Sequence, residues 1–282
     1  MNLLNAFKHP LALLGLLLVG GWVLIALCAP WLAPHDPLES FTPLLTPLLT
    51  PMTAGDDGVR FLLGTDMIGR DILSRLIWGT RTVLFWSILA TLTAFAVGIA
   101  MGLCAGYFNG WVDAALSYVA DTVLSFPVLV LYIVIIIALG ASALNILIAV
   151  TFTSAPAIFR IMRALTIDIR SRDYVLSAIT QGEGSLRIML VEILPNCGGP
   201  LIVDFCLRIG YTAIMIGALG FLGLGLPPPT PDWGGMINDG RAMAISFPHL
   251  VIFPCIAIST LMLGLSLLAD GLDEHAQQGA RS

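Results

Sequence analysis

The chain has 282 residues, of which 57% are hydrophobic and only 11% are charged, and its formal net charge is −5 at pH 7. A soluble domain carries about 25% charged residues, so this composition excludes a water-soluble globular protein. Apolar runs near 20 residues long cross a bilayer as helices, whereas barrel strands alternate. The sequence therefore predicts an all-α, polytopic membrane protein, and the absence of a basic tail gives no support for a nucleic-acid partner.

The chain carries no motif for catalysis of its own. Lys8 is the single lysine, which excludes the GxxxxGKS or GxxxxGKT loop that cradles ATP. An HExxH zinc helix and a GxSxG nucleophile elbow are also missing from the sequence. The five cysteines lie within or beside apolar runs, where they are expected to pack as small hydrophobic residues. We therefore expect no enzymatic activity, no metal and no directly bound cofactor.

Residues 11–33 are expected to form the first membrane helix. The run from Leu11 to Leu32 carries no charge, and at ~1.5 Å per residue it is long enough to cross ~30 Å of hydrocarbon. A cleaved signal peptide is the alternative, but its apolar core would contain only about 7 to 15 residues. We therefore expect an uncleaved anchor, with residues 1–10 forming a cytoplasmic N-terminus.

Residues 34–81 are expected to form an external loop. Pro43, Pro47 and Pro51 recur at intervals of four residues, a spacing that prevents a helix and favours extended chain. The loop also contains several arginines, which oppose the usual bias of positive residues toward the cytoplasm.

The string LGTDMIGRD, residues 63–71, closes this loop. It leads into residues 72–79, which we interpret as a short interfacial helix. One interpretation of the string is a capped surface turn in which Asp66 and Asp71 balance Arg70 and Arg75.

Residues 82–273 are expected to form a core of five further membrane helices, followed by a cytoplasmic tail at residues 274–282. The segment 82–106 carries no charge, and Asn109-Gly110 predicts a tight turn after it. The other four helices are expected at about residues 114–139 with Pro127 inside, at residues 144–160, after Asn196, and at residues 247–269.

Between the fourth and fifth of the six membrane helices lies a polar segment, residues 166–196, rich in both charge signs. Gly182-Glu183-Gly184 predicts a sharp turn between two short helices. Clustered arginines at the ends of membrane segments mark the cytoplasmic side. Those within or just before this segment are Arg160, Arg163, Arg170, Arg172 and Arg187.

The fifth membrane helix carries Asp204 and Arg208, which lie four residues apart and therefore on one helix face. A charge inside a membrane costs at least ~2.5 kcal/mol, so the two are expected to pair or to face a polar cavity. A structural ion pair and the lining of a transport pathway are both open. Asp121, near the start of the third helix, is interpreted as an interfacial or packing residue.

Four strings resemble the permease subunits of bacterial binding-protein-dependent ABC importers. The polar segment resembles their cytoplasmic coupling loop through Asp173, Tyr174, Ala178, Gly182, Ile188, Leu194, Pro195 and Asn196. LGTDMIGRD, GYFNGWVD at residues 106–113 and GFLGLGLPPPTPDWGGMINDGR at residues 220–241 resemble the dipeptide, oligopeptide and nickel branch. The family usually has Glu-Ala-Ala where this chain has Leu176-Ser177-Ala178.

This resemblance implies a type I importer permease with about six membrane helices. Such a subunit moves a small peptide, metal chelate or related solute across the inner membrane. It works with a second permease, an external binding protein and two ATPases that hold ATP and Mg. Both termini of this chain would then be cytoplasmic.

The resemblance also implies two groups of site residues. The first would dock the ATPase, with Gly182 permitting the turn and Tyr174 and Ile188 supplying apolar contact; it comprises Asp173, Tyr174, Ala178, Gly182, Ile188 and Pro195. The second would lie on the side of the external binding protein; it comprises Gly64, Asp66, Arg70, Asp71, Pro229, Asp232 and Trp233.

An ion-driven secondary transporter is the alternative function. It would use Asp121, Asp204 and Arg208 as its charged machinery and would work without an ATPase. Such transporters usually contain internal repeats, and none is visible in this sequence.

Overall fold

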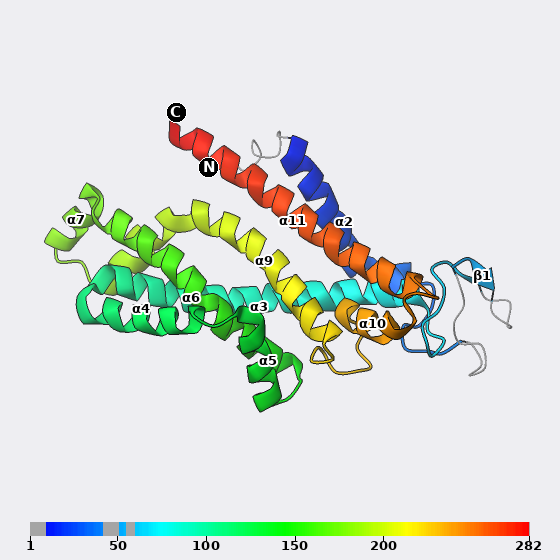
Figure 1. The fold of residues 1–282 in the computed structure, drawn as a ribbon. Helices are drawn as coiled ribbons and strands as arrows, with labels where there is room; N and C mark the ends of the chain where they lie inside the picture. Colours follow the sequence, from blue (N-terminus) through cyan, green and yellow to red (C-terminus); the bar gives the residue numbers. More distant parts are fainter. Residues whose placement is uncertain (1–9, 42–50, 55–59, 282) are drawn as a thin grey trace.

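Helices dominate the computed structural model, which describes residues 10–41, 51–54 and 60–281 (Figure 1). Within these residues, five helical spans are long and apolar enough to cross a membrane, and a bent pair of helices would make a sixth. This agrees with the all-α, polytopic fold expected from the sequence. The five spans are Pro10–Leu32, Ile72–Phe108, Ala143–Arg170, Ser185–Phe221 and His249–Leu272.

The described elements follow one another along the chain without a large sheet. The helices of the membrane region are α2 (Pro10–Leu32), α3 (Ile72–Phe108), α4 (Gly110–Leu124), α5 (Val128–Leu139), α6 (Ala143–Arg170), α9 (Gly198–Phe221) and α11 (His249–Arg281). The shorter elements are β1 (Thr53–Ala54), β2 (Arg60–Phe61), α7 (Asp173–Thr180), α8 (Ser185–Arg187), the π-helix Ile188–Ile193, the 3₁₀-helix Leu194–Cys197, α10 (Trp233–Gly240) and the 3₁₀-turn Arg241–Met243.

Helix α3 is continuous, so the expected interfacial helix at residues 72–79 is not a separate element. Gly79 lies within the continuous helix and allows a close approach of Trp233. A Cβ atom at Gly79 would lie 2.8 Å from Cδ1 of Trp233. With 37 residues, α3 is roughly 55 Å long, so it extends beyond the hydrocarbon core.

The expected third helix at residues 114–139 is broken in two. Helices α4 and α5 meet at residues 125–127 with a bend of 91°. Pro127 is the cause, because its missing N–H and its ring prevent a straight helix. Figure 1 shows α5 projecting from the side of the bundle.

Two helices are longer than expected. Helix α6 passes Pro156 and continues to Arg170, not to residue 160. Helix α11 begins at His249 and continues to Arg281, so residues 274–281 extend the last helix and do not form a separate tail. The N-terminal residues 1–9 and the prolines Pro43 and Pro47 lie outside the described residues.

Small residues bring the long helices close together. On α3, Gly98, Gly102 and Gly106 recur every four residues and face α6. A Cβ at Gly102 would lie 2.5 Å from Cβ of Met162, and one at Gly106 would lie 2.6 Å from Cβ of Thr166. Such small-residue spacing allows membrane helices to pack with their backbones in near contact.

The two ends of the bundle carry different elements (Figure 1). Helix α7 lies at one end, at the left of the view, whereas α2 and α11 run side by side from the right toward the upper middle and the upper left. β1 and α10 lie toward the other end. We call the α7 end the coupling end and the α10 end the external end, after the orientation that the sequence leads us to expect.

Candidate functional site

At the coupling end, α7 ends in a Schellman motif. Gly182 adopts φ +79°, the left-handed conformation that favours glycine. The N–H of Glu183 donates to the carbonyl oxygen of Ala178 at 3.2 Å, and the N–H of Gly182 donates to that of Ile179 at 3.0 Å. The motif turns the chain sharply into α8, as the glycines of this segment predict.

Helix α7 has one buried face and one exposed face. Val175 and Ala178 are 0% and 9% exposed, and Val175 packs in a cluster with residues of α3 and α6. Tyr174, Leu176 and Ile179 are 40%, 46% and 37% exposed. An exposed apolar face between charged residues is typical of a protein interaction site.

Ile188 does not supply the surface contact that we expected of it. Its side chain is 0% exposed and belongs to the same cluster as Val175. Residues 188–197 continue as π and 3₁₀ turns toward α9, and Ile188 anchors these turns to the membrane helices. Among the other expected docking residues, Asp173, Gly182 and Pro195 are exposed and Ala178 is buried.

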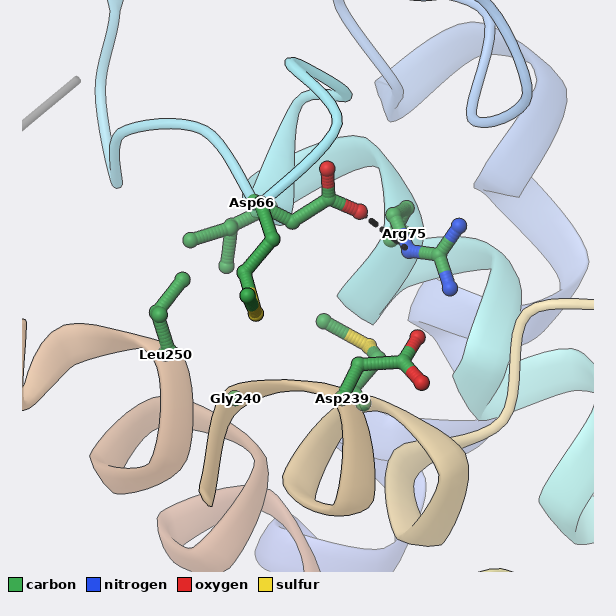
Figure 2. Close-up of a pocket in the computed structure, with 8 residues that line it drawn as sticks. Asp66, Arg75, Asp239, Gly240 and Leu250 are labelled. Atoms are coloured by element: carbon green, nitrogen blue, oxygen red, sulfur yellow. Dashed lines mark ion pairs between the residues drawn. The ribbon is translucent and has the colours of Figure 1, made fainter. Parts of the chain in front are cut away.

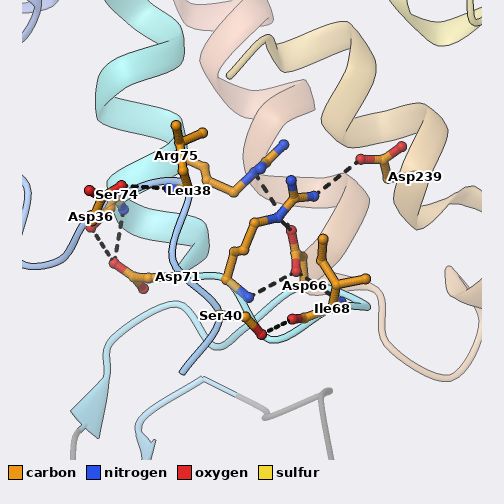
Figure 3. A network of polar contacts seen from close by, with 10 residues as sticks. Asp36, Leu38, Ser40, Asp66, Ile68, Asp71, Ser74, Arg75 and Asp239 are labelled. Carbon is orange, nitrogen blue, oxygen red and sulfur yellow. Dashed lines mark hydrogen bonds and ion pairs between the residues drawn. The ribbon is translucent and has the colours of Figure 1, made fainter. Parts of the chain in front are cut away.

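At the external end, the string LGTDMIGRD folds around Asp66 (Figure 3). Oδ1 of Asp66 accepts hydrogen bonds from the N–H groups of Ile68 and Arg70, both at 3.0 Å. Oδ2 accepts from Nε of Arg70 at 2.7 Å. Gly64 and Gly69 have φ of +81° and +82°, which the turn requires.

Asp71 caps the start of α3. Its Oδ2 accepts from the N–H of Ser74 at 3.0 Å and from the Ser74 hydroxyl at 2.6 Å. Nδ1 of His35 lies 3.3 Å from the same oxygen, and the His35 N–H donates to Oγ of Ser74 at 3.0 Å. This cap therefore also fixes the chain that leaves α2.

Arg75 lies in the first turn of α3, and its side chain, near Asp239 of α10, is 4% exposed. Figure 2 shows its guanidinium near Asp66 and Asp239. Nε of Arg75 is 3.6 Å from Oδ2 of Asp66, and Nη2 of Arg70 is 3.6 Å from Oδ2 of Asp239. The four side chains Asp66, Arg70, Arg75 and Asp239 form a balanced ion cluster, here called the external cluster.

Asp232 and Trp233 attach α10 to the bundle. Oδ2 of Asp232 accepts from the N–H of Gly235 at 2.9 Å as an N-cap. Burial raises the pKa of Asp232 to about 6, despite the opposing effects of the Gly235 and Gly234 N–H groups and of the positive charge of Arg75. Trp233 is 0% exposed, and its indole N–H donates to the carbonyl oxygen of Leu76 at 3.0 Å.

Most of the residues that we expected to face the external binding protein are buried. Gly64, Asp66, Asp71, Asp232 and Trp233 are buried, so these residues build the interior of the external end and do not form its surface. Pro229 is exposed on the loop before α10, and Arg70 is partly buried.

Within the membrane region, a cavity of about 210 Å³ lies between α4, α5, α6 and α9. Nε of Arg208 donates to Oδ2 of Asp204 at 2.6 Å, so the expected pair forms. Arg208 also lines the cavity, here called the membrane cavity. Its lining residues are Leu124, Val128, Tyr132, Thr153, Ser154, Ala157, Arg208, Tyr211, Thr212 and Met215.

Asp121 is not part of the membrane cavity. It forms an exposed ion pair with Nη2 of Arg160 at 2.6 Å and does not line the membrane cavity. Within the described parts of the chain, no three His, Cys, Asp or Glu side chains are grouped as a metal site requires.

Sequence reasoning missed Tyr132, Ser154 and Tyr211 as cavity residues. A signal was present, because hydroxyl groups at Thr151, Thr153 and Ser154 interrupt an apolar helix just before its proline.

Two family models match this chain. Residues 94–282 match the binding-protein-dependent transport system inner membrane component. Residues 5–52 match the N-terminal membrane domain of oligopeptide transport permease C.

Known permeases are similar over most of their length. The dipeptide transport system permease protein DppC of Haemophilus influenzae is 40% identical over 93% of this chain and 88% of that protein. The di/tripeptide transport system permease protein DppC of Pseudomonas aeruginosa is also 40% identical, over 93% and 86%. The glutathione transport system permease protein GsiD of Pectobacterium atrosepticum is 36% identical, over 89% and 81%.

A solved inward-facing structure of the MetNI methionine ABC transporter has a similar fold. Its TM-score is 0.57 at 15% identity, and the match covers 71% of this chain and 94% of that one. The likeness supports the importer permease fold. An ion-driven secondary transporter is not supported, because the matched families serve transport systems that depend on a binding protein. The chain thus belongs to the inner membrane components of binding-protein-dependent ABC importers, as a multi-pass, non-catalytic permease of the OppC and DppC type.

Proposed function

We propose that this chain forms one half of the pore of an ATP-driven importer of small peptides. The similarity to permeases named for dipeptides, di- and tripeptides and glutathione supports this substrate class. A second permease would complete the pore, and an external binding protein would deliver the peptide. ATP and Mg would be held by two separate ATPase subunits.

The exposed apolar face of α7 carries the proposal for ATPase docking. Tyr174, Leu176 and Ile179 project from a helix held at the end of the bundle by its buried face. Leu176 stands where the family usually has glutamate. We therefore expect the ATPase surface facing Leu176 to be apolar.

Charge supports a cytoplasmic position for the coupling end. Five arginines lie within or just before the polar segment 166–196, as expected for a cytoplasmic loop. The start of α2 packs against the later part of α11 through Ala12 and Gly271, and both lie away from the external end (Figure 1). Both chain termini are therefore proposed to be cytoplasmic, and the external end is proposed to face the binding protein.

The buried side of α7 provides a physical route for coupling. Val175 and Ile188 pack with Phe95 of α3 and Met162 of α6. A movement of α7 imposed by the closing ATPase dimer would therefore shift packed helices as rigid bodies. Alternation between outward-facing and inward-facing arrangements follows from such shifts.

Co-purification and uptake test this function together. The tagged chain is expressed with its neighbouring transport subunits and purified in mild detergent, and ATP-dependent dipeptide uptake is measured in proteoliposomes. Tyr174→Asp should lose the ATPase subunits and uptake while retaining the second permease. Ile245→Asp is the matched control for co-purification of the ATPases, because Ile245 is fully exposed at the end opposite α7. Retention of the ATPases by Tyr174→Asp would contradict the docking role.

A further inference from the structure

The membrane cavity combines a charged group with hydroxyl groups from three helices. Arg208, Tyr211 and Thr212 come from α9, whereas Tyr132 comes from α5 and Ser154 from α6. Apart from Thr153, the remaining lining residues are apolar. A few polar groups converging on an apolar hollow are typical of a small-molecule site.

Arg208 has unused hydrogen-bonding capacity. Its guanidinium has five N–H donors, and Nε bonds to Asp204. Among the described residues, the terminal nitrogens of Arg208 have no hydrogen-bond partner. These nitrogens form the fork that binds a carboxylate in bidentate fashion. Asp204 leaves this fork free and fixes the side chain from the other edge.

The break between α4 and α5 lies beside the same cavity. Leu124 ends α4, Val128 begins α5, and both line the cavity. The first turn of α5 carries backbone N–H groups that have no partner within the helix. Broken membrane helices place such groups at solute sites in transporters. The break between α4 and α5 and the side chain of Arg208 therefore both lie at the membrane cavity.

We infer that the membrane cavity binds the terminal carboxylate of a small peptide, with Arg208 as the anchor and Asp204 as its positioning residue. The inference rests on the proposed function, because it assigns a site to the proposed peptide. Ionisable residues inside a membrane are costly and mark solute pathways. In the absence of solute, the charges of Arg208 and Asp204 balance each other.

The size of the cavity limits what it holds. Its volume of about 210 Å³ is below the ~300 to 1,000 Å³ of complete ligand pockets. Tyr211 is 56% exposed at its edge, so the cavity opens at the surface of this chain. It therefore accommodates one end of a peptide, and the rest would lie against the second permease.

Replacing Arg208 tests the site with the assembled importer. Proteoliposomes containing the importer take up either alanyl-alanine or its C-terminal amide. Arg208→Gln should reduce uptake of the free acid by about tenfold or more, since a charged hydrogen bond is lost. Uptake of the amide should not fall. Arg160→Gln is the matched control, because Arg160 forms an exposed pair with Asp121 and is not among the lining residues of the cavity.

A merely structural ion pair gives a different result. In that case Arg208→Gln would reduce uptake of acid and amide by the same factor, and the inference would be overturned. ATPase activity stimulated by the loaded binding protein is measured in parallel. A variant with normal stimulation and selective loss of acid uptake supports the site.

A second readout does not depend on transport. Phenylglyoxal modifies arginine side chains, and mass spectrometry quantifies the product at each position in the importer without its binding protein. Alanyl-alanine should slow modification of Arg208 several-fold, whereas the amide should not, and Arg160 serves as the internal reference. If the wild-type importer moves no peptide, the proposed substrate is wrong, and this protection result decides the cavity separately. Equal modification with and without the acid would overturn the inference.

Discussion

The two ends of the molecule use their sequence motifs in opposite ways. At the external end, the charged motif residues turn inward, and Asp66, Asp71 and Arg75 are buried. At the coupling end, α7 turns Tyr174 and Leu176 outward, and its ion pair between Asp168 and Arg172 is exposed. The comparison shows that the residues of one family motif can be buried to hold the fold together, whereas those of another can form an exposed surface for contact.

Removal of one buried acid should have the largest effect on stability. Asp66→Ala leaves the buried Arg75 and the partly buried Arg70 without their nearest carboxylate. Loss of one partner from a buried ion cluster costs about 3–5 kcal/mol of unfolding free energy. Thermal unfolding in detergent should therefore show a much lower midpoint or no folded protein.

The coupling end supplies the control for that change. Asp168→Ala removes the partner of Arg172, but both side chains are exposed, so the unfolding midpoint should hardly change. Equal losses from Asp66→Ala and Asp168→Ala would show that the two ends do not differ in this way.

The pH dependence of stability should identify Asp232 as another buried acid that matters at the external end. Its pKa is about 6 in the folded protein and ~3.9 in an unfolded chain. Between these values the folded state binds more protons, so stability falls as pH rises from ~4 to about 6. The total loss is roughly 3 kcal/mol.

Asp232→Asn isolates that effect. Asparagine keeps the N-cap acceptor for Gly235 but does not ionise. Unfolding midpoints of wild type and variant are measured from pH 4 to 8, and the variant should gain relative to wild type as pH rises. A constant difference across this range would contradict the raised pKa.

A smaller effect is expected at the turn of the coupling end. Gly182 has φ +79°, and a Cβ atom added there would meet nothing within 4 Å. Gly182→Ala should therefore cost only about 1–2 kcal/mol, the strain of a left-handed conformation. Gly184→Ala is the control, because Gly184 has φ −66° and the same open space. Equal unfolding midpoints for the two variants would show that φ is not the cause.

The sequence predicted the fold better than the roles of individual residues. Charge-free runs and glycine turns depend on local chemistry, so the membrane helices and the Gly182 turn were predictable. The close contact between Gly79 and the ring of Trp233 joins residues that lie 154 positions apart in the chain. The burial of Ile188 and Asp66 likewise depends on which helices pack together. A motif identifies important positions, but only tertiary contacts decide whether a side chain faces a partner or the core.

The smallest effect on stability, and the most specific one on assembly, is expected at Leu176. Leu176→Glu introduces the residue that the family usually has at this position, and the side chain is 46% exposed, so stability should change by no more than about 0.5 kcal/mol. If the partner ATPase presents an apolar surface here, the carboxylate becomes buried without a partner, and binding of the ATPase weakens by about tenfold. Titration of purified ATPase against the reconstituted permease pair measures this, with Leu176→Met as the control. Tighter binding of the Glu variant would show that the ATPase retains a polar cleft, and that the outward face of α7 is not matched by apolar contact at this position.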